Sequence, residues 1–219
     1  NVASNKMNED MINKKKITLG WWKENNGTTF TLPYSKKSSL QRTNKRSNID
    51  VIQNGYIYPY HAARKNTLFK EVFELNEENG IFIGLFLAEG QAYKSTVVIT
   101  NLNENVRDFV KQWFDKHNIE WTEKEKINKI GGKTNTITGN CVLLSTFLKK
   151  WVGHKAENKY VPSEAFIANE NFIKGLLNGY YSGDGTISRN SIDVSSASKR
   201  LIEGISMLCS RFGIFGKVS

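Results

Sequence analysis

The sequence predicts an α+β fold that consists of two related halves, and three observations support this prediction. A shift of 95 residues aligns Glu89-Gly90 with Asp184-Gly185. At that shift, apolar residues agree in type and spacing, first with the period of a strand and then along one helix face. Each half also opens with an apolar, glycine-containing segment of helical length. The matched apolar residues are Val97, Ile99, Val106, Val110, Trp113, Phe114 and Ile119 in the first half, and Ile192, Val194, Leu201, Ile205, Leu208, Cys209 and Ile214 in the second.

The periodicity of the first half predicts its elements in order. After the apolar helix come a strand and a second helix, then two strands around a turn, and finally a helix. The first helix is expected at 80–90, the strand at 97–99 and the second helix at 106–114. The next two strands are expected at 119–126 and 133–138, around a turn at 128–132. The final helix has Val142, Phe147, Leu148 and Trp151 facing inward. In the second half, Ser219 aligns with Lys124, so we expect its last strand and last helix to be missing from this sequence.

The region ahead of the repeat has a different composition. We expect a loose polar leader at 1–16, two strands within 17–34 around Asn25-Asn26-Gly27, a polar loop at 35–48 and extended chain at 51–60. We therefore divide the chain into a basic N-terminal region at 1–73, a first half at 74–160 and an incomplete second half at 161–219.

Charge is concentrated at the N-terminal end. The chain carries a net charge of +10, and residues 1–70 hold 13 Lys/Arg against 4 Asp/Glu. Such a segment attracts polyanions through counterion release, which favours a nucleic-acid partner. A solvated basic arm that aids solubility is the alternative.

Composition excludes other classes of protein. The longest apolar runs are about half of what a membrane span needs, and the N-terminus lacks the layout of a secretion signal. We expect a soluble, intracellular protein. Two cysteines, Cys141 and Cys209, argue against a disulfide scaffold and a zinc cluster. His61, His117 and His154 are too dispersed for a His-x-x-x-His metal site.

The two apolar helices share a pattern of small residues. Gly84 and Ala88 in the first, and Gly179 and Gly183 in the second, are spaced four apart and form a strip on one helix face. Two such strips facing each other allow the helix backbones to approach closely. Gly90 and Gly185 are expected to adopt the left-handed conformation that ends many helices.

An acid ends each of these helices. The helix dipole disfavours a carboxylate at a C-terminus by roughly 0.3–1 kcal/mol, so stability does not explain Glu89 and Asp184. If the glycine strips pair, both carboxylates and several free carbonyls meet at one place. Hard oxygen ligands of this kind favour Mg²⁺. A buried helix with a surface acid is the alternative for either motif alone.

The segments Ile83-Gly-Leu-Phe-Leu-Ala-Glu-Gly90 and Asn178-Gly-Tyr-Tyr-Ser-Gly-Asp-Gly185 resemble the two signature motifs of LAGLIDADG homing endonucleases. The flanking Gly55-Tyr-Ile-Tyr-Pro-Tyr60 and Lys159-Tyr-Val-Pro162 are similar to the variety encoded within inteins. The resemblance covers about 51–219 and implies two pseudo-symmetric αββαββα halves. Their mixed sheets would form a saddle over DNA, and the motif helices would form the central interface.

The resemblance also implies an activity. Glu89 and Asp184 would be the metal-binding catalytic acids of a Mg²⁺-dependent endonuclease that cuts both strands of its DNA target. We suggest Lys133 as a basic catalytic residue in the first half; a solvated lysine after the Gly-Gly turn is the alternative. Polar residues alternating along the strands are candidates for DNA contacts, with pure solvent exposure as the alternative: Lys94, Thr96 and Thr100, with Arg189, Ser191 and Ser195 at the same shift.

Other functions are open at this point. A protein on the same scaffold could bind nucleic acid without cleaving it, as a maturase or regulator. Protein splicing needs a nucleophile at the first residue and His-Asn at the end, so we expect that this chain, from Asn1 to Ser219, cannot splice alone. It could still be the middle of a larger intein, with the remaining intein segments as partners in cis or in trans.

Overall fold

The computed structural model describes residues 16–18, 51–53, 56–58, 69–70, 72–127, 131–188 and 191–217. The expected turn at Asn25-Asn26-Gly27, the polar loop at 35–48 and Arg189 lie outside these residues. The expected extended chain at 51–60 is present where it is described, as the paired strands β2 (Val51–Gln53) and β3 (Tyr56–Tyr58). Strand β3 also pairs with β4 (Phe69–Lys70). Strand β1 (Lys16–Thr18) pairs with β5 (Val72–Glu74), which leads into the first half.

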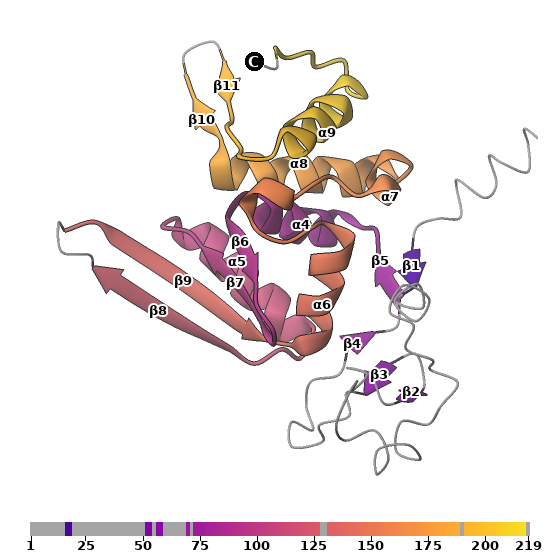
Figure 1. Cartoon of the computed structure of the whole chain (residues 1–219), viewed down its shortest axis with the longest axis vertical. Coiled ribbons are helices and arrows are strands. Elements are labelled where there is room, and N and C mark those ends of the chain that lie inside the picture. The colour runs from indigo at the N-terminus through magenta and orange to yellow at the C-terminus, as the bar shows by residue number, and fades with distance from the viewer. Residues whose placement is uncertain are drawn as a thin grey trace, which may run out of the picture.

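The first half has the order of elements that the resemblance implies, αββαββα. Its helices are α4 (Glu77–Glu89), α5 (Glu104–Lys116) and α6 (Val142–Trp151). Its strands are β6 (Gly90–Ala92), β7 (Thr96–Thr100), β8 (Trp121–Ile127) and β9 (Lys133–Asn140), which form one sheet in the order β6-β7-β9-β8. Figure 1 shows the long β8–β9 hairpin extending to the left, away from the helices.

This sheet is antiparallel throughout, so the expectation of mixed sheets is wrong for it. Short turns join β6 to β7 and β8 to β9, and such connections impose antiparallel pairing. β7 and β9 are also antiparallel, with Val97 opposite Gly139 and Ile99 opposite Ile137. A Cβ at Gly139 would lie 2.6 Å from the Phe114 ring, so glycine lets α5 pack closely on the sheet.

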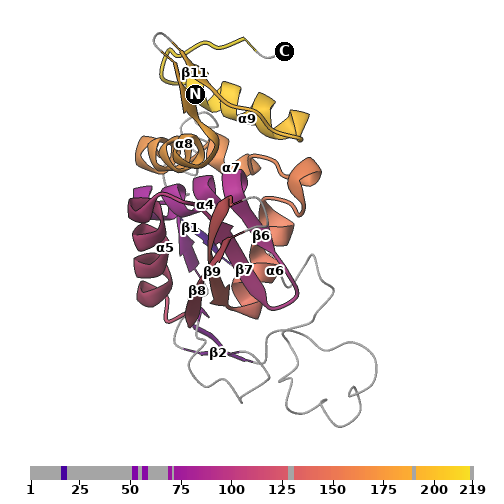
Figure 2. The same ribbon diagram turned by 90° about the vertical axis from the view of Figure 1, so that its left-hand side faces the viewer.

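The two faces of the sheet differ in burial because side chains alternate along each strand. Val97, Ile99 and Ile137 are buried beneath α5 and α6, which flank the sheet in Figure 2. The opposite face carries partly or fully exposed polar residues and is not covered by a helix of the first half. This second face is called the open face below.

The second half repeats the first four elements. Helix α8 (Glu170–Asp184) is followed by β10 (Thr186–Ile187), β11 (Ile192–Asp193) and α9 (Lys199–Ser210). Between the halves lie a short 3-10 helix at Ala156–Asn158 and α7 (Ser163–Phe166). The residues of α9 that match α5 in the sequence repeat, Leu201, Ile205, Leu208 and Cys209, are buried as expected.

Helices α4 and α8 pack against each other at the centre of the molecule (Figures 1 and 2). Helix α4 is buried nearly all round, with Phe82, Ile83, Leu85 and Phe86 at most 1% exposed. Each helix begins at an asparagine: the side chains of Asn76 and Asn169 accept hydrogen bonds from backbone N–H groups of the first turn. Within the described residues, no helix is long and apolar enough to cross a membrane.

Candidate functional site: an acid pair and a buried lysine

Helices α4 and α8 run in the same direction, so their C-terminal ends lie together. Gly175, near the start of α8, lies against Glu77 at the start of α4. Further along, Gly179 lies against Ile81, and Gly183 near the end of α8 lies against Ala88. The last residues of the two helices, Glu89 and Asp184, are therefore neighbours although 95 positions separate them in sequence.

Glycine is required along this interface because backbone meets backbone. A Cβ on Gly84 would lie 2.1 Å from the Leu176 carbonyl oxygen, and one on Gly179 would lie 2.1 Å from that of Ile81. Gly80 and Gly175 make equally close approaches, at 2.3 and 2.2 Å, and sequence reasoning missed both. Their spacing of four from Gly84 and Gly179 would have revealed them.

The glycines that follow the acids are not left-handed, contrary to the expectation. Gly90 has φ −83° and ψ 150°, and Gly185 has φ −76° and ψ 132°. The chain leaves each helix directly in the extended conformation of the next strand. Close approach requires glycine here instead: a Cβ at position 90 would lie 2.4 Å from Phe86 Cδ2, and one at position 185 would lie 2.3 Å from the Tyr181 carbonyl oxygen.

Burial and neighbouring charges shift the pKa values of both acids. Burial raises the pKa of Glu89, and the negative charge of Asp184 raises it further. Burial likewise raises the pKa of Asp184, while the positive charge of Lys159 opposes the rise. The Glu89 side chain lies next to position 183, where a Cβ would stand 3.3 Å from Glu89 Cγ. The pair therefore combines partial burial with mutual repulsion, an arrangement that a cation relieves.

Lys159 is the third member of the site, and the sequence analysis did not assign it a role. Its ammonium donates hydrogen bonds to the carbonyl oxygens of Phe86 at 2.9 Å and Leu87 at 3.0 Å, in the last turn of α4. The residue is only 6% exposed, and desolvation lowers the pKa of Lys159 to about 8 even though Asp184 and Glu89 favour its charged form. A buried lysine beside two acids is typical of a reactive centre.

Lys133, the basic residue suggested from the sequence, lies elsewhere. It is the first residue of β9, at the tip of the β8–β9 hairpin, and its ammonium is 3.6 Å from the carboxylate of Glu125. It is absent from the charges that act on the pKa of Glu89 or Asp184. The structure does not bring it to the acid pair, because β9 begins at the outer end of the hairpin (Figure 1).

The suggested DNA contacts of the first half divide between a strand and a turn. Thr96 and Thr100 are in β7 and point to the open face, where Thr100 Oγ1 lies 3.4 Å from Thr136 Oγ1. Lys94 is exposed in the turn before β7. In the second half, Ser191 and Ser195 are exposed beside β11, and Ser191 donates a hydrogen bond to Asp193.

The open face contains further polar residues that sequence reasoning missed. Pairing with β9 places Thr122, Lys124 and Lys126 of β8 opposite Thr138, Thr136 and Thr134. The intervening Glu123 points to the helix face, where it pairs with Arg107 at 2.9 Å and Lys111 at 3.2 Å. The alternation Thr-Glu-Lys-Glu-Lys at 122–126 therefore sends its two lysines to one face, a signal that the sequence contained.

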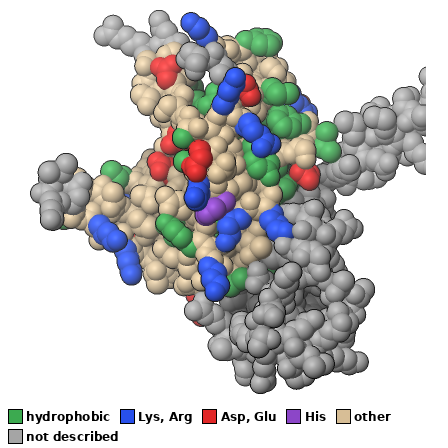
Figure 3. Space-filling view, in the orientation of Figure 1, with side chains coloured by type: hydrophobic (Ala, Val, Ile, Leu, Met, Phe, Trp, Pro, Cys, Tyr) green, Lys and Arg blue, Asp and Glu red, His purple; other side chains and the backbone are tan. Residues whose placement is uncertain are grey.

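The ends of α4 and α8 that carry the acids lie on the same side of the molecule as two hairpins. Figure 1 shows α4 and α8 ending on the side from which the β8–β9 and β10–β11 hairpins project, and Figure 3 shows the surface hollowed between these hairpins. Lys and Arg side chains are interspersed with acids over the face in that view.

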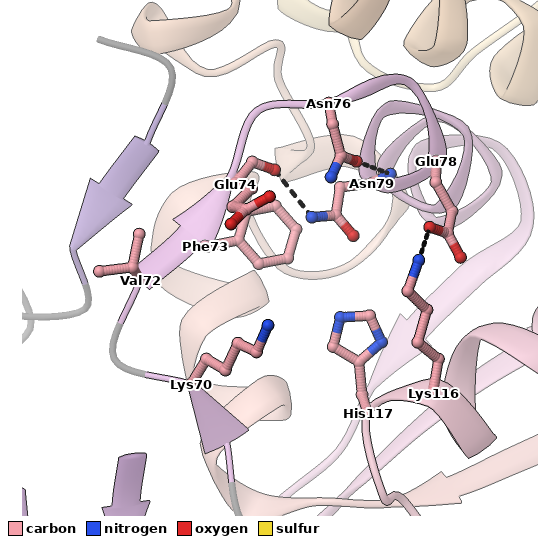
Figure 4. Close-up of a pocket in the computed structure, with 9 residues that line it drawn as sticks. All are labelled: Lys70, Val72, Phe73, Glu74, Asn76, Glu78, Asn79, Lys116 and His117. Carbon is pink, nitrogen blue, oxygen red and sulfur yellow. Dashed lines mark hydrogen bonds and ion pairs between the residues drawn. The ribbon is translucent and has the colours of Figure 1, made fainter. Parts of the chain in front are cut away.

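A second pocket, of about 90 Å³, lies at the opposite end of α4 (Figure 4). There Asn79 donates a hydrogen bond to the Glu74 carbonyl oxygen at 2.7 Å, and Lys116 pairs with Glu78. Burial lowers the pKa of His117. The length of α4 separates this pocket from Glu89 by about 18 Å, so it is not part of the acid site.

Comparison with known proteins supports the assignment of the fold. Residues 171–219 match the family described as LAGLIDADG-like domain. Two solved structures of I-DmoI, one a complex with DNA and Ca and the other of mesophilic variants of this homing endonuclease, have a TM-score of 0.50 and 13% identity. Each covers 65% of this chain, and the chain covers 75% and 80% of them, respectively. The fold is that of LAGLIDADG homing endonucleases.

Two relatives come from Methanocaldococcus jannaschii. The DNA-directed RNA polymerase subunit Rpo1C is 35% identical over 65% of this chain, and the replication factor C small subunit is 30% identical over 72%. The chain spans only 16% and 8% of these relatives. The similarity is thus confined to a small part of each.

Proposed function

We propose that this chain is a site-specific DNA endonuclease that hydrolyses phosphodiester bonds at the acid pair of Glu89 and Asp184. The observation that carries this proposal is the parallel packing of α4 and α8, which delivers two partly buried carboxylates to one place beside Lys159. The LAGLIDADG-like match at 171–219 and the fold support the same conclusion.

The residues present fit a divalent cation, for which we propose Mg²⁺. Two carboxylates that repel each other in a partly buried place gain from a cation between them. Mg²⁺ is commonly bound by one or two carboxylates together with substrate phosphates and water. At this site, Glu89 and Asp184 would hold the cation, whose chemistry would be to activate water and to neutralise the leaving oxygen.

We assign the protein groups as follows. Glu89 and Asp184 would hold the divalent cation, and each acid would serve one strand of the DNA duplex. Lys159, in its charged form, stabilises the negative charge that develops on the phosphate, because its ammonium is fixed and shielded from water. The final carbonyls of α4 point at Lys159, which keeps the ammonium in place.

The open face provides the surface for DNA. Thr96, Thr100 and Thr136 can contact base edges in the major groove, and Lys124 and Lys126 can contact phosphates. Lys94, Ser191 and Ser195 lie on exposed turns beside the strands and can add to these contacts. Arg189 is proposed from the sequence repeat alone.

We also propose that the chain is part of an intein. Its relatives include an RNA polymerase subunit and a replication factor subunit, whose roles differ, and it matches only a small part of each. A segment shared by otherwise unrelated proteins is the pattern that an inserted element leaves. Expression of the complete reading frame tests this: mass spectrometry should detect a joined host protein and a released segment containing this chain.

One experiment tests the nuclease activity. The protein is incubated with Mg²⁺ and a library of randomised DNA duplexes, and the cut ends are sequenced. We expect a narrow set of cut sites with the parent and none with Glu89→Gln or Asp184→Asn. Sequence-selective binding without cutting by the parent would favour the alternative of a maturase or regulator. Cutting that both variants retain would refute the assignment of the acid pair.

A further inference from the structure

The backbone at Lys159 is held from both halves of the molecule. On one side, the Tyr160 N–H donates a hydrogen bond to the Val152 carbonyl oxygen at 3.0 Å, just after α6. The Tyr160 hydroxyl also donates to the Lys150 carbonyl oxygen at 3.0 Å. On the other side, Ser198 Oγ donates to the carbonyl oxygen of Lys159 itself at 2.6 Å. Ser198 is 3% exposed, so this bond is shielded from bulk solvent.

Helix α9 touches the same segment at two further points. The Arg200 guanidinium lies over the Tyr160 ring, 4.5 Å from its centroid. Gly204 lies so close to Val161 that a Cβ would stand 2.8 Å from the Val161 Cβ. The first turns of α9 therefore run along residues 159–161, and Ser198 is the contact at Lys159.

These contacts fix the backbone at Lys159 and so determine where the Lys159 ammonium can reach. The Lys159 side chain must extend from a buried backbone position to the Phe86 and Leu87 carbonyl oxygens, at 2.9 and 3.0 Å. Hydrogen bonds weaken steeply as distance and angle depart from this geometry. A backbone displacement of about 1 Å at a catalytic group is enough to slow a reaction about a hundredfold.

We propose that Ser198 is a positioning residue: by anchoring the carbonyl group of Lys159 to α9, it fixes the Lys159 ammonium against the end of α4 beside the acid pair. A residue of the second half thereby helps to hold the Lys159 ammonium against α4, a helix of the first half. This inference rests on the proposed function in one respect, that the acid pair with Lys159 is the reactive centre.

The variant Ser198→Ala removes the anchor. We expect the rate of reductive methylation of Lys159, followed by mass spectrometry with the exposed Lys174 as reference in the same digest, to rise about tenfold because the side chain gains access to solvent. On a duplex recovered from the library experiment, we expect kcat to fall about tenfold with KM unchanged.

Ser198 is also the N-cap of α9, since its Oγ accepts a hydrogen bond from the Leu201 N–H at 3.3 Å. Asn103→Ala is the matched control, because Asn103 caps α5 through the Asn105 N–H at 3.0 Å. Both variants should unfold at a lower temperature. Only Ser198→Ala should change the labelling of Lys159 and kcat, and Ser198→Thr, which keeps the hydroxyl, should restore both.

Gly204→Ala is a second, independent variant. It keeps the Ser198 hydroxyl but pushes Val161 away from α9, so it should also increase the labelling of Lys159. If Ser198→Ala and Asn103→Ala give equal labelling and equal kcat, Ser198 has only a structural role and the inference is wrong, even where Glu89→Gln abolishes cleavage. If the parent does not cleave DNA, the proposed function fails, and the labelling comparison still decides whether Ser198 positions Lys159.

Discussion

Gly84 of α4 lies directly against Leu176 of α8, because a Cβ at position 84 would stand 2.1 Å from the Leu176 carbonyl oxygen. No side chain separates the two helix backbones at this point. The distance between the helices, and with it the placement of Glu89 beside Asp184, depends on the absence of a methyl group here and at the other glycines of the interface.

Gly84→Ala should therefore be strongly destabilising. Both backbones are rigid, so the new methyl group can be accommodated only if the helices move apart, and overpacking of this kind costs about 3 kcal/mol. Chemical denaturation measures the free energy of unfolding. Gly216→Ala is the control, since no atom lies within 4 Å of its Cβ position, and it should leave the free energy of unfolding unchanged. An equal effect of both substitutions would contradict the interface described above.

Glu89→Gln should stabilise the protein at neutral pH. The pKa of Glu89 is raised chiefly by burial and then by Asp184, so the folded state binds the proton more tightly than the unfolded state does. The stability that protonation provides is complete below the usual pKa of about 4 and is lost as pH rises through the higher folded-state value. The neutral amide of glutamine at position 89 does not ionise, so the variant does not lose this stability.

Thermal unfolding at pH 7 and pH 4 checks this prediction. The variant should exceed the parent at pH 7, and the difference should shrink toward pH 4. Glu120→Gln, at an exposed position, removes the same charge and is the control. A lower unfolding temperature of Glu89→Gln at pH 7 would show that the carboxylate stabilises the fold.

Mg²⁺ should raise the unfolding temperature of the parent and not that of Glu89→Gln or Asp184→Asn. A ligand that binds only the folded state at a hundred times its Kd adds about 2.7 kcal/mol. For a chain of this size, that corresponds to a rise of roughly 5–11 °C. Because this measurement needs no DNA, it separates metal binding from cleavage. An equal rise in all three proteins would place the cation elsewhere.

Lys159→Met should remove a pH dependence of stability at alkaline pH. Desolvation lowers the pKa of Lys159 to about 8, whereas the unfolded chain titrates near 10.4. Between these values the unfolded state binds more protons, so the parent gains stability as pH rises from 8 to 10.4. The full gain is about 3 kcal/mol. The difference between parent and variant isolates it from the other titrating groups, and identical slopes would show that the ammonium is well hydrated.

Lys124→Ala and Lys126→Ala should each weaken DNA binding and reduce the slope of log K against log salt by about 1. Their side chains lie on the open face, whereas Lys116 pairs with Glu78 at the end of α5. Lys116→Ala removes the same charge and is the matched control. Fluorescence anisotropy at several salt concentrations measures all three. An unchanged slope in the β8 variants would mean that DNA does not bind along β8.

Much of this site was predictable from local pattern. The spacing of Gly84 and Ala88 and the repeat at Gly179 and Gly183 specify two small-residue helix faces, because a helix has a fixed period. Glu89 and Asp184 follow from the same register. Where prediction failed, one local requirement replaced another: Gly90 is needed because of the Phe86 ring and backbone one turn earlier, not because of a left-handed turn.

Lys159 was beyond such reasoning. It follows a short 3-10 helix in a connection with no hydrophobic period, and its partners in α4 are 71 to 73 positions away. Lys133 was suggested instead because it opens a strand, but the direction of the β8–β9 hairpin takes it away from the acid pair. The sequence around Lys133 does not show which end of the hairpin faces the helices, and the sequence around Lys159 does not show that it contacts α4.

The sequence by itself determined the two-part architecture, the glycine-lined helices and the acids at their ends, because these depend on periods of two and 3.6 residues and on a repeat. Only the tertiary structure decided that the Lys159 ammonium accompanies the acids, which face of the sheet is open and which residue anchors Lys159. Each of those depends on segments that meet only when the two halves pack together, and chain spacing does not encode such contacts.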